Sequence, residues 1–110
     1  KYEELYNDAA EKVDEVAERI LQLGSTPESR FSVYLQTSEI KEAGVVSCSK
    51  EALDLLLDYY KTLIARERRI IEVASEAHDD TTVSLVSDFL KEQEKTVWML
   101  VAVSSQSCAE

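Results

Sequence analysis

Residues that break helices or form tight turns are scarce in this sequence. The 110 residues include two glycines and one proline, and helix-forming residues are abundant. This composition is typical of a helical protein. The glycines, Gly24 and Gly44, lie far apart, so no glycine-rich phosphate-binding loop is present. No Ser-His-Asp pattern of a nucleophilic enzyme is recognisable either.

Cysteines and long apolar runs are also scarce. The two cysteines, Cys48 and Cys108, lack the spacing of metal ligands, which excludes a zinc pattern and favours a reduced, cytoplasmic setting. Neither thiol is assigned a role. No window approaches the roughly 18 apolar residues that a membrane-spanning helix requires. The chain begins with Lys1 rather than Met, and no signal-peptide pattern follows.

Basic residues are outnumbered by acidic ones. Lys and Arg total 12 against 22 Asp and Glu, which gives a net charge of −10, while 45% of the residues are hydrophobic. The hydrophobic content is too high for a disordered chain, and the length suits one domain over residues 1–110. The acidity argues against binding nucleic acid through the bulk surface and is compatible with binding cations.

The first long helix is predicted over about residues 1–23. Its apolar residues share one face at helical spacing, and Gly24 and Pro27 follow as a stop signal. Asp14 and Glu18 lie four residues apart on one flank of that face. Because no cap residue precedes the pattern, we expect the natural helix to begin upstream. The face consists of Tyr2, Leu5, Tyr6, Ala9, Val13, Val16, Ala17 and Ile20.

Two further long helices are predicted over about residues 50–77 and 82–103. The connection over residues 24–49 is too long for a bare loop in a compact domain, so we expect a short helix near Phe31. Three amphipathic helices with one long connection resemble a helical bundle that lacks a member. The long connection would let two consecutive helices run parallel, which is the ferritin-like layout rather than the up-down one.

Apolar stripes define a buried face on each of these two helices. Glu67 falls inside the first stripe, where a lone buried carboxylate is costly. We therefore interpret Glu67 as paired with an arginine or facing a neighbouring subunit rather than as a ligand. Asp80 or Thr81 is expected to cap the last helix. The two stripes consist of Ala52, Leu53, Leu56, Tyr59, Tyr60, Leu63, Ile64, Ile70, Ile71 and Ala74, and of Val83, Val86, Phe89, Leu90, Val97, Leu100 and Val101.

Three motifs resemble the Dps family, the ferritin-like mini-ferritins named as DNA-binding proteins from starved cells. The first is VDEVAER at residues 13–19, followed by LGSTP at residues 23–27. The run SEIKE at residues 38–42 resembles the family's S-x-I-K-E. The run EKTVWML at residues 94–100 resembles its E-K-x-x-W-M-L. The three matches occur in order and together cover most of the chain.

The resemblance implies an all-α, ferritin-like four-helix bundle that assembles into a hollow shell of twelve subunits. Members of the family bind ferrous iron, oxidise it with hydrogen peroxide or oxygen, and store a ferric mineral. Their ferroxidase site lies between two subunits, with two histidines from one subunit and an Asp and a Glu from the other. The expected function is therefore that of a cytoplasmic iron-storing ferroxidase that detoxifies ferrous iron and peroxide.

The resemblance also assigns roles to acidic residues of the first helix. Asp14 and Glu18 match the two ferroxidase acids, and Glu3 and Glu4 match acids that face the cavity and help to nucleate mineral. Carboxylates suit ferrous iron, a borderline cation that also takes imidazole ligands. Without the family match, two acids four residues apart are more often a solvated helix flank, because exposed helical acids are common.

The sequence departs from the family pattern at several positions. The first helix and the start of the second, which carry both ferroxidase histidines, are missing, and the single histidine, His78, falls in a turn. Asp79 and Asp80 match the acidic turn near the three-fold pores, but Ser84 stands where the family often has aspartate. We expect the chain alone to bind and oxidise iron poorly. No lysine-rich tail is visible, so DNA binding is not carried over.

Two functions of different classes remain open. The first is an iron-oxidising storage protein of the Dps type, of which this chain carries the acidic half of the site. The second is a non-enzymatic, acidic helical-bundle interaction module. The first predicts a large symmetric shell that consumes ferrous iron, so the mass of the full-length protein and its iron oxidation rate distinguish the two.

Overall fold

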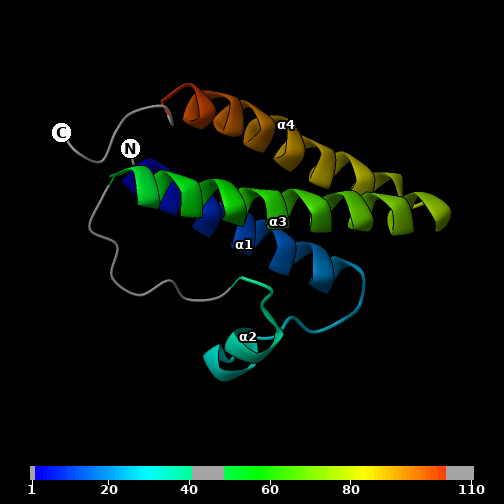
Figure 1. Ribbon diagram of the computed structural model, residues 1–110. Helices are drawn as coiled ribbons and strands as arrows, with labels where there is room; N and C mark the ends of the chain where they lie inside the picture. Colours follow the sequence, from blue (N-terminus) through cyan, green and yellow to red (C-terminus); the bar gives the residue numbers. More distant parts are fainter. Residues whose placement is uncertain (1, 41–48, 104–110) are drawn as a thin grey trace. The chain divides into compact units, whose positions relative to one another are not determined.

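The computed structural model describes residues 2–40 and 49–103. These ranges contain four α-helices and no strand: α1 (Tyr2–Gln22), α2 (Phe31–Thr37), α3 (Ser49–Glu76) and α4 (Asp80–Val103) (Figure 1). The described residues are divided between Ser38 and Glu39 into two compact units, one with α1 and α2 and the other with α3 and α4. The prediction of an all-α chain is confirmed.

Helix α1 ends at a glycine that adopts a left-handed conformation. Gly24 has φ of 89°, which is accessible to glycine without steric cost. Its N–H donates to the carbonyl of Leu21 at 3.0 Å, and the Ser25 N–H donates to the carbonyl of Ile20 at 3.0 Å. This pair of hydrogen bonds is the Schellman arrangement, which satisfies carbonyls that the helix end would leave unpaired. The predicted stop signal acts through this geometry.

Helices α3 and α4 run side by side in opposite directions and form the α3/α4 hairpin (Figure 1). In the turn between them His78 has φ of 59°, and the Asp79 N–H donates to the carbonyl of Ala74 at 2.8 Å. Histidine is one of the few non-glycine residues that tolerate this region. The guanidinium of Arg68 lies 3.2 Å from the Glu94 carboxylate and links the two helices at mid-length.

Asp79 caps α4. Its Oδ1 atom accepts a hydrogen bond from the Thr82 N–H at 3.1 Å, and its Oδ2 atom accepts one from the Thr82 hydroxyl at 2.5 Å. Asp80 is already the first residue of the helix. The prediction that Asp80 or Thr81 is the cap is therefore wrong, because the helix begins earlier than the apolar pattern alone indicates.

The buried seam of the hairpin is narrower than the predicted stripes. Its apolar members are Tyr60 and Ala74 on α3 and Val86, Phe89 and Leu100 on α4. Other stripe members are exposed, namely Leu63, Ile70 and Val101. The contact between two helices is a seam of positions about seven residues apart, whereas a helical wheel assigns every apolar residue of a wide arc to the interior.

Polar side chains occupy the middle of that seam. Glu67 is buried, as its place in the stripe predicts, and Gln93 is only 4% exposed. Glu67 lies seven residues from both Tyr60 and Ala74, and Gln93 lies seven residues from Val86. The Oε1 atom of Gln93 is buried and accepts no hydrogen bond from the residues that the structure describes. The seam therefore has a polar layer between apolar layers.

Two of the expectations drawn from absences concern membranes and thiols. Within residues 2–40 and 49–103, no helix combines the length and the apolar content that crossing a membrane requires. Cys48 and Cys108 lie outside the described residues, as does Ser47, which precedes α3.

Candidate metal site on helix α1

Asp14 and Glu18 both project from α1 into solvent, one helical turn apart. Neither carboxylate makes a hydrogen bond or an ion pair with another residue in the described part of the chain. Their neighbours on the helix are engaged differently: Lys12 donates to Asp8 at 2.7 Å, and Arg19 donates to Gln22 at 2.9 Å. The two acids are therefore accessible to a ligand.

No third ligand joins this pair within the described residues. Across 2–40 and 49–103, no group of three or more His, Cys, Asp or Glu side chains is close enough to hold a metal ion. Two carboxylates that approach from one helix can supply part of a coordination sphere, and the remaining positions must be filled by water or by groups from elsewhere. On geometry alone, the pair is half of a site.

Glu3 and Glu4 lie exposed in the first turn of α1. Acidic residues in this position interact favourably with the positive end of the helix dipole. This interaction accounts for two acids at the helix start without any ligand. Their predicted role in mineral nucleation stays a prediction.

Asp79 and Asp80 differ in what their carboxylates do. Both oxygens of Asp79 are occupied by the cap of α4, and the side chain is partly buried. Asp80 is exposed in the first turn of the helix. A structural reason therefore exists for each acid, and their assignment to a pore stays a prediction. His78 is exposed in the same turn.

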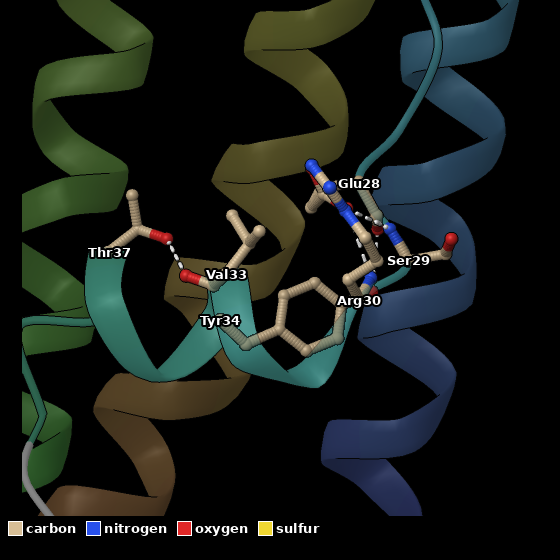
Figure 2. Close-up of polar contacts among 6 residues, drawn as sticks. All are labelled: Glu28, Ser29, Arg30, Val33, Tyr34 and Thr37. Atoms are coloured by element: carbon tan, nitrogen blue, oxygen red, sulfur yellow. Dashed lines mark hydrogen bonds and ion pairs between the residues drawn. The ribbon is translucent and has the colours of Figure 1, made fainter.

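The most perturbed carboxyl group lies elsewhere, just before α2. The guanidinium and backbone N–H of Arg30 donate to Glu28 and lower the pKa of that carboxyl from 4.5 to about 2, with a smaller contribution from the Ser29 N–H (Figure 2). In turn the carboxylate raises the pKa of Arg30. The sequence analysis missed this cluster, although an acid two residues before a base at a helix start was a usable signal.

Comparison with known proteins places the chain among ferritin-like proteins. The ferritin family, described as the ferritin-like domain, matches residues 1–106. A DNA protection during starvation protein of Porphyromonas gingivalis is 50% identical over 106 residues, which cover 96% of this chain and 67% of that protein. A DNA protection during starvation protein 2 of Bacillus anthracis is 33% identical and covers 96% of this chain and 73% of its own length.

Solved structures agree with the sequence matches. The Dps protein of Vibrio cholerae, described as a member of a superfamily of ferritin-like diiron-carboxylate proteins, has a TM-score of 0.89 at 42% identity, covering 92% of this chain and 64% of that one. Dps of Staphylococcus aureus has a TM-score of 0.90 at 30% identity, covering 96% of this chain and 71% of that one.

The chain thus spans about two thirds of the length of these relatives, 67% of the Porphyromonas protein and 64% of the Vibrio chain. The all-helical architecture and the fold similarity confirm the predicted ferritin-like fold class. The motifs on α1 and α4 lie within the matched residues. The chain belongs to the Dps family of ferritin-like proteins.

Proposed function

We propose that this chain is part of an iron-storing mini-ferritin and forms part of a single ferritin-like domain. The observation that carries the proposal is the pair of exposed carboxylates, Asp14 and Glu18, in a motif that resembles the Dps signature. The similarity to proteins that protect DNA during starvation supports the same function class. The description of the Vibrio cholerae relative as a diiron-carboxylate protein supports iron as the substrate.

In this proposal Asp14 and Glu18 bind ferrous iron and take part in its oxidation by peroxide or oxygen. Anionic oxygens stabilise a ferric product more than a ferrous one, because the charge of the metal increases on oxidation. The pair is completed by ligands from a second subunit. The chain's single histidine, His78, follows α3 and is far from Asp14 in the sequence, so it is not assigned to the site.

Further assignments extend from the same resemblance. Glu3 and Glu4 are proposed to nucleate mineral on the cavity side, and Asp79 and Asp80 to line the entry pore for iron. Because Asp79 caps α4, its contribution to the pore would be electrostatic rather than direct coordination. We also propose a shell of twelve subunits and a cytoplasmic location. DNA binding is not proposed for this chain.

The decisive experiment measures ferrous iron oxidation by the protein extended to the length of its relatives. Asp14→Asn combined with Glu18→Gln is expected to slow oxidation and leave the mass of the assembly unchanged, because the substitutions keep side-chain size and remove the charge. Glu11→Gln combined with Glu15→Gln is the matched control. It removes two exposed acids with the same spacing from the same helix and is expected to leave the rate unchanged.

Three results would count against the proposal. Unchanged kinetics in the Asp14/Glu18 variant would remove these residues from the site. Equal slowing in the Glu11/Glu15 control would indicate a general effect of surface charge. A monomeric extended protein with no oxidation above buffer would favour the alternative, a non-enzymatic acidic helical-bundle interaction module.

A further inference from the structure

Helix α2 is a short element that has little reason to be stable by itself. It contains seven residues, none of them buried, and its apolar side chains Phe31 and Leu35 are 80% and 72% exposed. Isolated helices of this length are unstable in water because nucleation is costly and few hydrogen bonds offset it. Burial does not supply the missing stability, so polar contacts are the remaining source.

Glu28, which precedes the helix, supplies most of the polar contacts at its start (Figure 2). Its Oε2 atom accepts hydrogen bonds from the backbone N–H groups of Ser29 and Arg30, both at 3.0 Å, and from Arg30 Nε at 2.9 Å. Its Oε1 atom accepts a fourth from Arg30 Nη2 at 3.1 Å. One carboxylate therefore fixes both the backbone and the side chain of the residue at the N-cap.

A second set of contacts returns from the helix to the same residue. The Tyr34 hydroxyl donates to the backbone carbonyl of Glu28 at 2.6 Å. The Tyr34 ring meets the Phe31 ring edge to face, with centroids 5.7 Å apart. The helix N-cap, Arg30, makes no side-chain cap of its own, yet its carbonyl accepts from the N–H groups of Val33 and Tyr34 at 3.1 Å. Glu28 thus takes over the role of the cap.

We propose that α2 is a conditionally folded helix held by the Glu28 clamp, meaning Glu28 with its partners Ser29, Arg30 and Tyr34. The clamp replaces the hydrophobic contacts that stabilise the other helices. Loss of the Glu28 carboxylate releases α2 and leaves α1, α3 and α4 folded. The device is independent of the iron chemistry proposed above, since it involves none of the acids assigned to that site.

Hydrogen–deuterium exchange on the chain tests this device. In the unmodified chain the amides of Val33, Tyr34 and Ser38 donate within or beside α2 and are expected to be protected. In Glu28→Ala they are expected to exchange at nearly the rate of an unstructured peptide, while the α3 and α4 amides keep their protection. Tyr34→Phe, which removes one hydrogen bond and keeps the ring contact, is expected to have an intermediate effect.

Glu72→Ala is the matched control, because Glu72 is also an exposed acid and lies 3.7 Å from its partner Arg69 on α3. It is expected to leave the exchange of α2 unchanged. The proposal is overturned if Glu28→Ala leaves α2 protected, or if α2 exchanges freely in the unmodified chain. It is also overturned if Glu28→Ala exposes α3 and α4 together with α2, because the clamp would then be part of the global fold.

Discussion

The α3/α4 hairpin and helix α2 are stabilised in opposite ways. The hairpin has a seam of buried side chains, centred on Phe89 and Leu100, and its exposed ion pair between Arg68 and Glu94 is an addition to that seam. Helix α2 has no buried residue and depends on hydrogen bonds to Glu28. Burial stabilises a long element through many weak contacts, whereas α2 depends on a few specific ones. The two regions should therefore respond differently to substitutions and to pH.

The largest effect is expected from the apolar seam. Leu100 is 2% exposed, and Leu100→Ala should lower the free energy of unfolding by about 2–5 kcal/mol, through lost burial and the cavity that remains. Val101→Ala, at a 53% exposed position next to it, should change that free energy by less than about 0.5 kcal/mol. Urea unfolding measures both. Equal effects would show that the seam lies elsewhere.

The polar layer should give an effect of opposite sign. Gln93→Met keeps the length of the side chain and removes a buried acceptor that has no hydrogen bond among the described residues. The free energy of unfolding should rise by about 1 kcal/mol, because the cost of burying an unsatisfied polar group disappears. Gln36→Met, at an exposed position on α2, is the control. A marked loss of stability in Gln93→Met would mean that the amide has a partner in solution.

The cap of α4 tests the end of the hairpin. Asp79→Ala removes both hydrogen bonds to Thr82 and should lower the free energy of unfolding by about 1 kcal/mol. Asp80→Ala, one residue later, leaves that cap in place and should cost less. Thermal unfolding of the two variants compares them directly. The reverse order would restore the cap that the sequence pattern indicated.

The same comparison explains what could be predicted from the sequence. Long amphipathic helices were predictable because their apolar residues repeat at 3.6-residue spacing, and the stop at Gly24 follows from one glycine. The burial of Gln93 was not predictable, since a polar residue is assigned to the surface unless the partner helix is known. The Glu28 clamp was missed because its contacts depend on the conformation of the connection rather than on periodicity.

The candidate site was predictable in part for a similar reason. Asp14 and Glu18 were found through a motif and their spacing on one helix, and both are accessible on α1. Helical spacing fixes their relation to each other and says nothing of ligands from other chains. The role of Asp79 as a cap could not be distinguished from a pore role in the sequence, because the same carboxylate suits both.

The smallest effect on overall stability, and the most local one, is expected from pH. The pKa of Glu28 is about 2 in the folded chain against an ordinary value of 4.5, so the carboxylate favours the folded form of α2 fully above about pH 4.5. As the pH falls toward 2, protonation removes the clamp and the amides of α2 should lose protection while those of the hairpin persist. Arg30→Gln removes the largest cause of the shift and should bring the carboxyl pKa back toward its ordinary value. An NMR titration of the Glu28 side chain in both chains measures this, and a midpoint near 4.5 in the unmodified chain would show that the clamp does not form in solution.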